Sequence, residues 1–389
     1  MTNPKPWQDI GRHAMLPQPT LDERAHLDVV AHLNLFATER LAPAVQRAYE
    51  RQGVAANDRH EVRRLMEPNP DYRTWSLLRR NTMEQRQHVV RNLVGRQRIE
   101  LQEKARELNR DGESAGTLRL NPKLQVPRYV CAVDQHLLRG GYTAEWLQDD
   151  VSNAANYDAG MFATLGGGAG PWNNAAGRAL ANWLRSNFPA FSPARIVDLG
   201  CGLGHNTLPL RQCFPHAEII AIDVAAPMLR YGHARARSLG VTDVKFWQQD
   251  AVQTSIESHS CDLVFTTMVL HETSKEALPR FFREAHRLLR AGGLTLHLEQ
   301  PTYRGLPPLE QFMRDWDGKH NNEPFWSALH ETNLPQLLQA AGFHEEHIFE
   351  TRCVAQDSIE DVPHEDFGRA PAWYGVGAWQ AATGDAVND

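Results

Sequence analysis

The spacing of apolar positions changes near residue 195. Before it, residues 21–50 and 82–108 carry apolar side chains at helical spacing, with a bend or restart expected at Pro43. After it, short apolar runs alternate with helical stretches, which predicts a parallel, doubly wound α/β sheet. The runs predict strands at 195–199, 218–222, 244–248, 261–266 and 294–299, with helices at 207–214, 226–239 and 275–289.

The apolar stripe within residues 82–108 is narrow. Its members are Val90, Leu93, Val94, Leu101 and Leu108. A stripe this narrow suits a helix that packs on one neighbour or on a second subunit. We therefore expect residues 1–128 to form a helical N-terminal region that caps the rest of the chain or provides a homodimer surface.

Composition excludes several classes of protein. The chain has 389 residues with 42% apolar residues, 23% charged residues and a net charge of -6, which is typical of a globular protein and not of a disordered one. No apolar run approaches the roughly 18 residues of a membrane span, and residues 1–20 lack the apolar core of a secretory signal. The five cysteines are scattered without a CxxC pair, so neither a disulfide framework nor a zinc site is expected. These features predict a cytoplasmic protein with no membrane partner.

Residues 59–128 are locally basic, with 16 Lys and Arg against 9 Asp and Glu. A solvated helical face explains this excess. A nucleic-acid arm would need more aromatic side chains for base stacking than Tyr72 and Trp75. A nucleic-acid partner is therefore not expected.

A glycine-rich turn follows the first strand of the second part. Asp198 closes the strand, and Gly200, Gly202 and Gly204 follow at every second position. Glycines permit positive φ and let a ligand approach the backbone closely. The GxGxG spacing differs from the GxGxxG of pyrophosphate-binding turns, and the carboxylate would repel a pyrophosphate but suits a cationic amino group. Another type of nucleotide-binding α/β protein is the alternative.

Polar residues also follow the next two strands. Asp223 ends the second strand and could accept hydrogen bonds from both hydroxyls of a ribose. Asp250 follows the third strand and could accept from an adenine amino group, with the Ala251 amide facing the ring. Val224 and Met228 could supply apolar contacts to the adenine. For Asp250, a turn or helix-cap role is the alternative.

Together, these strand-end residues resemble the class I S-adenosylmethionine-dependent methyltransferases, from residue 195 to about residue 300. A helix at 334–342 and strands at 347–354 and 373–381 resemble the final antiparallel hairpin of that family. The resemblance implies a Rossmann-like sheet with this terminal hairpin, a methyltransferase domain over residues 129–389, and S-adenosyl-L-methionine as the cofactor.

The resemblance also implies roles for individual residues. Asp198 would face the methionine amino group, directly or through water, and Gly200 and Gly202 would line the methionine and the ribose. An aromatic side chain from the preceding segment, Tyr142 or Tyr157, could face the sulfonium, because a cation is attracted to a ring face; packing is the alternative for either. The expected cofactor-binding residues are Tyr157, Asp198, Gly200, Gly202, Gly204, Asp223, Val224, Asp250 and Ala251.

Methyl transfer from a sulfonium is an in-line displacement, so positioning of the two reactants supplies much of the catalysis. A general base is needed only when the acceptor carries a proton. His271 and Glu272 after the fourth strand and Glu299 at the end of the fifth face the same rim, and they are the candidate catalytic residues. For His271, a structural hydrogen bond is the alternative. His297 is expected to be a core histidine.

An insertion at residues 301–333 is rich in aromatic side chains. Connections this long are usually functional, and we expect this one to cover an acceptor pocket. A packing flap without substrate contact is the alternative. The candidate substrate-binding residues are Tyr303, Trp316, His320 and Trp326. His320, His330 and Glu331 have a spacing that fits no standard metal site, so no metal is expected.

The sequence therefore predicts a methyltransferase that acts on a small-molecule acceptor at oxygen or nitrogen. One alternative is an RNA or protein methyltransferase that binds its acceptor through residues 59–128. The tetrapeptide at 266–269, Thr-Thr-Met-Val, is unlike the Asn-Pro-Pro-Tyr type and disfavours N-methylation of a base or amide. A cofactor-binding regulator without catalysis is the second alternative. NAD-dependent redox chemistry is disfavoured by the carboxylate before the glycine turn.

Overall fold

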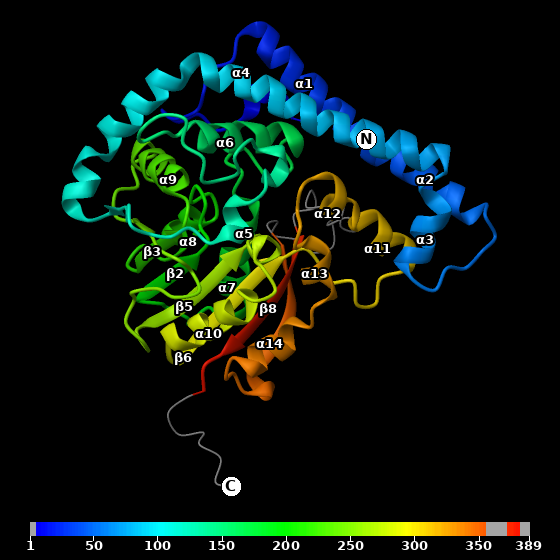
Figure 1. The fold of residues 1–389 in the computed structure, drawn as a ribbon. Coiled ribbons are helices and arrows are strands. Elements are labelled where there is room, and N and C mark those ends of the chain that lie inside the picture. The colour runs from blue at the N-terminus through cyan, green and yellow to red at the C-terminus, as the bar shows by residue number, and fades with distance from the viewer. Residues whose placement is uncertain (1–4, 355–371, 382–389) are drawn as a thin grey trace.

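A mixed sheet forms the centre of the molecule (Figure 1). The computed structural model describes residues 5–354 and 372–381. Among these residues the sheet has eight strands in the order β1-β4-β3-β2-β5-β6-β8-β7, and every neighbouring pair is parallel except the two made by β8. The strands are β1 (Leu118–Arg119), β2 (Arg195–Leu199), β3 (Glu218–Asp223), β4 (Lys245–Gln248), β5 (Cys261–Thr267), β6 (Leu289–Glu299), β7 (Ile348–Val354) and β8 (Ala372–Trp379).

The strands predicted from apolar runs are confirmed. β5 is buried at all seven positions, as expected for a parallel strand covered on both faces. β6 begins at Leu289 and not at Leu294, and its register against β5 shifts between Cys261 and Leu263. The sequence did not predict β1, because two residues are too few to show a period. The β8–β7 pair is the predicted terminal hairpin.

Helices cover both faces of the sheet and end near their predicted bounds. One hydrophobic core joins α7, α8 and α9 to one face, and a second joins α10 and α14 to the other. Parallel strands and covering helices place the carboxyl ends of β2, β3 and β5 at one edge. The bounds are α7 (Ala175–Asn187), α8 (Thr207–Cys213), α9 (Ala226–Ser238), α10 (Leu278–Leu288) and α14 (Leu334–Ala340).

The N-terminal region is helical, as predicted. α1 (Leu21–Phe36) starts at a capping box in which Thr20 and Glu23 bond to each other's backbone amides. A π-helical turn over Ala37–Leu41 then leads into α2 (Ala42–Glu50), which carries Pro43 in its first turn, where a missing N–H costs little. At the predicted bend or restart near Pro43, the helix thus changes to a π-helical turn just before the proline, and the backbone stays helical through it. α3 (Arg59–Met66) and α4 (Pro70–Ala115) complete the region.

α4 is a single helix of 46 residues and lies across the upper side of the domain in Figure 1. It begins 12 residues before the predicted start, because Tyr72 and Trp75 pack against Phe312 and Trp316 of the insertion. Its narrow stripe is buried against α1, α6 (Ser152–Thr164) and α9 of the same chain. The stripe thus has its partners within one chain, and the N-terminal region shares a core with the domain that follows.

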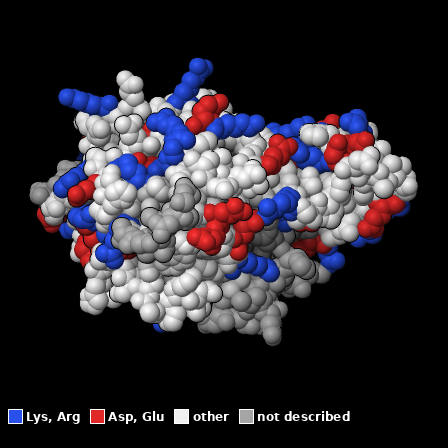
Figure 2. All heavy atoms as spheres, turned by 90° about the horizontal axis from the view of Figure 1, so that it is seen from below, with Lys and Arg blue, Asp and Glu red and all other residues white. Residues whose placement is uncertain are grey.

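Many cations of residues 59–128 are paired with carboxylates of the same chain. Arg63 contacts Asp315 and Arg79 contacts Asp317, while Arg96 contacts Glu23 on α1. On the face shown in Figure 2, acidic and basic side chains are interspersed. The basic excess therefore serves contacts within the fold as well as a solvated face.

The remaining helices are short. The insertion forms α11, α12 and α13, which lie beneath one end of α4 in Figure 1. The glycine run that follows α6 is fastened by a hydrogen bond from the Lys5 amide to the Gly166 carbonyl. Within the described ranges, no helix is long and apolar enough to cross a membrane. The bounds are α5 (Arg128–Cys131), α11 (Pro308–Arg314), α12 (Trp316–His320) and α13 (Trp326–Glu331).

Candidate active site

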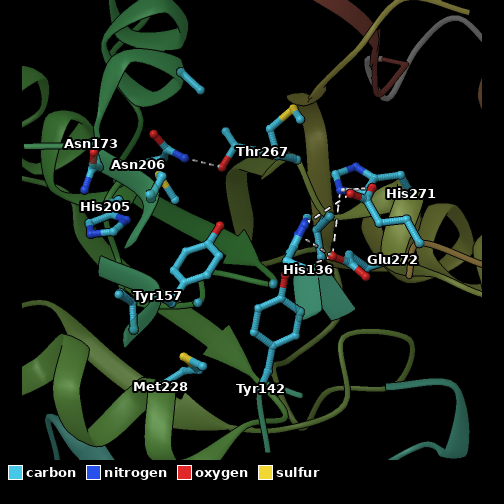
Figure 3. Close-up of a pocket in the computed structure, with 18 of the residues that line it drawn as sticks. His136, Tyr142, Tyr157, Asn173, His205, Asn206, Met228, Thr267, His271 and Glu272 are labelled. Atoms are coloured by element: carbon cyan, nitrogen blue, oxygen red, sulfur yellow. Dashed lines mark hydrogen bonds and ion pairs between the residues drawn. The ribbon is translucent and has the colours of Figure 1, made fainter. Parts of the chain in front are cut away.

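A cavity of about 330 Å³ opens at the carboxyl ends of β2, β3 and β5 (Figure 3). Its walls come mainly from the strand ends, the segment from residue 129 to 176, α4 and the insertion, with single residues from α1, α9, α10 and β8. Of the predicted site residues, it is lined by Tyr157, Gly200, Gly202, Asp223, Val224, Asp250, Ala251, His271, Glu272 and Trp326.

The glycine turn after β2 has the backbone that its sequence predicts. Gly200, Gly202 and Gly204 all have positive φ. A Cβ at Gly200 would lie 2.4 Å from Val269, whereas one at Gly202 would meet nothing within 4 Å. A Cβ at Gly204 would meet the ring of Phe246, a residue of β4. Gly200 and Gly202 therefore line the cavity, and Gly204 lets the turn pack on the sheet.

Asp198 lies beneath this turn and is 1% exposed. Its Oδ2 accepts a hydrogen bond of 2.6 Å from the Thr207 hydroxyl. Its Oδ1 has no hydrogen-bond partner in the part of the chain that the structure describes. Burial raises the pKa of this carboxyl to about 7. The Oδ1 atom of Asp198 thus lacks a donor, and a cationic group beside this atom would favour the charged form of the carboxyl.

Asp223 and Asp250 lie at the neighbouring strand ends. The carboxylate of Asp223 accepts from the amides of Gly202 at 2.9 Å and Ala225 at 2.8 Å. Each carboxylate oxygen can accept more than one hydrogen bond, so acceptor capacity remains for a ligand. Asp250 accepts from the Val252 amide at 3.0 Å, so it has a turn role and also lines the cavity.

Tyr142 and Tyr157 both line the cavity, with ring centroids 5.7 Å apart. Tyr157 projects from α6 and stacks on His205, with ring centroids 6.4 Å apart. Tyr142 donates to Glu272 at 2.9 Å. Burial, reinforced by the Glu272 carboxylate, raises the pKa of both phenols, so both rings are neutral at physiological pH. In Figure 3 the two rings lie side by side on one wall.

His271 lies in the short helix Leu270–Glu272 after β5, and its ring is held from behind by Glu299. Its Nδ1 is 2.8 Å from Glu299 Oε2, and Glu299 Oε1 accepts from the Leu270 amide at 2.7 Å. Burial lowers the pKa of His271, but the carboxylates of Glu299 and Glu272 outweigh it and raise that pKa to about 9. Glu299 is fully buried and does not line the cavity, so it acts through His271 and not on a ligand directly.

His136 faces His271 and Glu272 from a loop, and no pattern in the sequence marks it as a site residue. Its Nε2 is 3.1 Å from Glu272, and its Nδ1 is 3.1 Å from Glu323 of the insertion. Burial lowers its pKa, but Glu323 and Glu272 raise it to about 10. The backbone of His136 has a positive φ of 51°, held by hydrogen bonds from Arg86 and Gln87 of α4 to its carbonyl. A strained backbone fixed in this way is common at functional sites.

The insertion contributes to the cavity through residues other than most of those predicted. Tyr303 donates to Asp315 at 3.0 Å, Trp316 donates to Ser76 at 2.7 Å, and His320 packs on Trp316. These three aromatic side chains join the insertion to itself and to α4 and do not line the cavity. Trp326 does line it. The other lining residues from the insertion and α4 are Asp317, Asn321, Glu323, Arg79, Met83 and Arg86.

His297 is a core histidine, as expected. It is fully buried between Thr266 and Thr295, whose hydroxyls each lie 2.9 Å from one of its ring nitrogens. Burial lowers its pKa to about 3, so the ring is neutral. His297 therefore takes no part in the cavity.

Comparison with known proteins agrees with this geometry. Residues 196–293 match the family model of a methyltransferase domain. The chain is 31% identical over 158 residues to an uncharacterised methyltransferase of Synechocystis sp. PCC 6803, and the match covers 40% of this chain and 69% of that protein. The chain belongs to the class I S-adenosylmethionine-dependent methyltransferases, whose cofactor is S-adenosylmethionine.

Two further similarities cover less of the chain or are weaker. The chain is 38% identical over 101 residues to the malonyl-[acyl-carrier protein] O-methyltransferase of Methylococcus capsulatus. That match covers 26% of this chain and about a third, 35%, of that relative. A solved O-methyltransferase family protein from Burkholderia thailandensis is 12% identical, with a TM-score of 0.42 and coverage of 59% of this chain and 60% of that one.

The residues at the strand ends fit the cofactor. Asp198 does not itself line the cavity, but its partnerless Oδ1 lies beneath the glycine turn and suits the methionine ammonium, directly or through water, since a buried carboxylate needs a donor or a cation. The open space beside Gly202 leaves room for the ligand, and the remaining acceptor capacity of Asp223 suits ribose hydroxyls. Val224 and Met228 supply an apolar wall at the same end of the cavity.

We expect Asp223→Ala to weaken the binding of S-adenosylhomocysteine by about 1–3 kcal/mol, because charge-assisted hydrogen bonds to the ribose are lost. Calorimetric titration of the folded variant measures this change. Asp243→Ala is the matched control. Asp243 is exposed in the loop before β4, at the amino end of that strand, whereas the cavity lies at the carboxyl ends of the strands. Equal affinities of the Asp223 variant and the wild type would contradict the assignment.

We expect the affinity for S-adenosylhomocysteine to rise about tenfold between pH 6 and pH 8, since the fraction of ionised Asp198 rises by that factor around a pKa near 7. The sign follows from the ligand: its ammonium binds the carboxylate and not the protonated carboxyl. Calorimetry across this range tests it. Asp198→Asn should abolish this dependence of affinity on pH. The affinity of the wild type for 5′-methylthioadenosine, which lacks the ammonium, should not depend on pH. A flat profile for the wild type would place the ammonium elsewhere.

Proposed function

We propose that this protein transfers the methyl group of S-adenosylmethionine to an oxygen or nitrogen atom of a small molecule bound in the cavity. One observation carries the proposal. A single cavity contains the cofactor-binding strand ends and, on its other side, the group of His136, His271 and Glu272. Two reactants placed at these two ends would meet within one enclosed space.

The walls of the cavity support a small acceptor. α4 closes it with Arg79, Met83 and Arg86, and the insertion closes it with residues that include Glu323 and Trp326. A polynucleotide or protein segment would have to displace these elements to reach the cofactor. The RNA or protein alternative is weakened further because cations of residues 59–128 are committed to carboxylates of the fold.

The side chains can then divide the work. The cofactor supplies a methyl group on a sulfonium, which makes the group electrophilic. Asp198 and Asp223 hold the cofactor, and the faces of Tyr142 and Tyr157 lie where a sulfonium would be stabilised by an aromatic ring. Glu272 orients the acceptor, and the neutral form of His271, whose fraction rises as the pH approaches its pKa of about 9, takes up the acceptor's proton as the new bond to carbon forms. Glu299 keeps His271 in position.

Titration of the purified protein with S-adenosylhomocysteine, with NAD as the control, tests the cofactor half of the proposal. Micromolar binding of the first and none of the second is the expected result. Release of S-adenosylhomocysteine from S-adenosylmethionine in the presence of phenols, amines and carboxylic acids tests the transfer. Binding without turnover over the whole panel would favour a regulator, and absence of binding would overturn the proposal.

A further inference from the structure

We propose that His136, His271 and Glu272 form a site for one divalent transition-metal ion at the acceptor end of the cavity. The ion's use in methyl transfer rests on the proposed function, whereas its binding does not. No spacing in the sequence indicates this site, because its ligands come from a loop near residue 136 and from the end of β5, with Glu323 of the insertion beside them.

The three side chains lie at metal-ligating distances. One ligand atom from each, taken together, all fall within 4.8 Å of one another. His136 Nε2 is 3.1 Å from Glu272 Oε1, and His271 Nε2 is 3.9 Å from the same oxygen. Zinc–nitrogen and zinc–oxygen bonds of about 2.0–2.2 Å place neighbouring ligand atoms about 3–3.5 Å apart. Small side-chain movements would therefore bring all three atoms onto one ion.

Both imidazoles are oriented as in known metal sites. His271 Nδ1 is 2.8 Å from Glu299, and His136 Nδ1 is 3.1 Å from Glu323 and 2.9 Å from the side-chain amide of Asn321, so each ring directs its Nε2 toward Glu272. Metal-binding histidines almost always donate their second ring N–H to a carboxylate or carbonyl, which fixes the tautomer. Here two histidines each have a carboxylate beside Nδ1, and both direct Nε2 toward the same third carboxylate, Glu272. A structural hydrogen bond to one histidine would not require this arrangement.

Buried carboxylate oxygens provide an independent sign of a missing cation. Glu272 Oε2 and Glu323 Oε2 are buried and have no hydrogen-bond partner within residues 5–354 and 372–381. Glu323 is 2% exposed, and its Oε2 lies 3.9 Å from His271 Nε2. An ionised carboxylate is costly to bury unless it is paired or binds a metal. A divalent ion at this point would satisfy oxygens that the protein leaves open.

The donor set indicates the class of metal. Two imidazoles and one carboxylate, with positions left open, suit zinc or iron(II) and related ions, whereas magnesium and calcium prefer oxygen ligands throughout. The open side faces the cavity, next to Trp326, whose ring centroid is 5.2 Å from that of His271. A metal there would supply a Lewis acid beside the acceptor and, by lowering the pKa of the bound acceptor group, would replace His271 and Glu272 in promoting loss of the acceptor's proton.

The competing occupant is a pair of protons. With both imidazoles protonated, His136 and His271 form ion pairs with Glu272, Glu299 and Glu323. The two protons carry the same charge of +2 as one divalent ion against these three carboxylates, and a binding measurement distinguishes the two occupants.

The test is a titration of the full-length protein with ZnCl₂ after treatment with a chelator and removal of that chelator. We expect one tight equivalent, with a dissociation constant at or below the micromolar range, and the same equivalent in the metal content of dialysed protein. Cobalt(II) in the same position should give a visible absorption spectrum from the protein-bound ion. MgCl₂ in a parallel titration should give no tight equivalent.

The double variant His136→Gln/His271→Gln should lose the tight equivalent, and Glu272→Gln should weaken it at least tenfold. His216→Gln is the matched control, because His216 is exposed before β3 and lies outside the cluster; it should bind as the wild type does. If the double variant does not fold, Glu323→Gln, a nearly isosteric change, replaces it in the zinc titration.

Binding of S-adenosylhomocysteine separates the possible failures. No tight zinc equivalent, or one that survives in the double variant and in Glu272→Gln, overturns the metal site. If S-adenosylhomocysteine still binds in that case, the cofactor assignment stands and the cluster is the proton-bearing ion-pair network. Loss of S-adenosylhomocysteine binding by the wild type would instead overturn the proposed function, whatever the result with zinc.

Discussion

Replacing Asp158 with Ala is expected to lower the free energy of unfolding by about 3–5 kcal/mol, the range found when one partner of a buried charged network is removed. Asp158 lies on α6 and is buried. Its Oδ1 is 2.8 Å from His205 Nε2, and its Oδ2 accepts from the Tyr231 hydroxyl at 2.8 Å and lies 3.1 Å from His13 Nε2. Arg235 of α9 completes the group at 3.7 Å.

The effect is large because Asp158 is the common partner of side chains from four other segments. The N-terminal segment contributes His13, the loop before α7 contributes Asn173, the loop before α8 contributes His205, and α9 contributes Tyr231 and Arg235. Without the carboxylate, these polar groups stay buried with fewer partners, and each carries a desolvation cost. Denaturant-induced unfolding, followed by circular dichroism, measures the change.

Asp149→Asn is the matched control for this prediction, because Asp149 has a positive φ of 60°, which Asn adopts more readily than Ala. Asp149 has a side chain that is 41% exposed, and it contacts Arg106 and Arg230 at 3.6 Å. Exposed ion pairs contribute about 0–1 kcal/mol, so this variant should unfold almost as the wild type does. A loss below about 1 kcal/mol for Asp158→Ala would mean that its partners find other hydrogen bonds and that the carboxylate does not hold these segments together.

His271→Ala is expected to lower turnover by about 10²–10⁴-fold, the usual contribution of a group that transfers a proton during the reaction. The affinity for S-adenosylhomocysteine should stay at the wild-type value, because His271 is held by Glu299 and faces Glu272, on the side of the cavity away from Asp223 and Asp250. The loss should appear in kcat, measured with an acceptor found in the panel of phenols, amines and acids.

His216→Ala controls for the loss of an imidazole, since His216 is exposed just before the amino end of β3 and does not line the cavity, which lies at the carboxyl ends of the strands. Its turnover should match that of the wild type. An unchanged kcat in His271→Ala would remove His271 from the reaction. A fall in cofactor affinity of the same size as the fall in turnover would indicate instead that the variant damages the whole cavity.

The sheet and the cofactor end of the cavity could be predicted from the sequence for the same reason. Parallel strands covered on both faces appear as short apolar runs, and their order places Asp198, Asp223 and Asp250 at one edge. Both predictions, that of the strands and that of the residues at their ends, required only the local pattern of the sequence. The strand β1 escaped because two residues carry no pattern.

The acceptor end depends on tertiary contacts that no local pattern contains. His136 reaches Glu323, which is 187 positions later, through a backbone in the left-handed region that histidine seldom adopts. The aromatic density of the insertion singled out this segment correctly, but it could not show which of the aromatic side chains point into the cavity. Tyr303 and Trp316 turn toward Asp315 and Ser76 in contacts that fasten the insertion, and Trp326 alone of the predicted substrate residues turns to the cavity.

The long helix α4 has a consequence for how knowledge of relatives can be transferred. It forms one wall of the cavity with Arg79, Met83 and Arg86, and the insertion forms another. Both lie outside residues 196–293, the range that matches the methyltransferase-domain model. Proteins alike only in that range match this chain at the strand ends and at His271 and Glu272, but the match does not reach the two walls that α4 and the insertion form. The substrate of such a relative therefore cannot be assigned to this chain from that similarity alone. The identity of the methyl acceptor has to be sought in relatives that also carry the residue 70–115 helix.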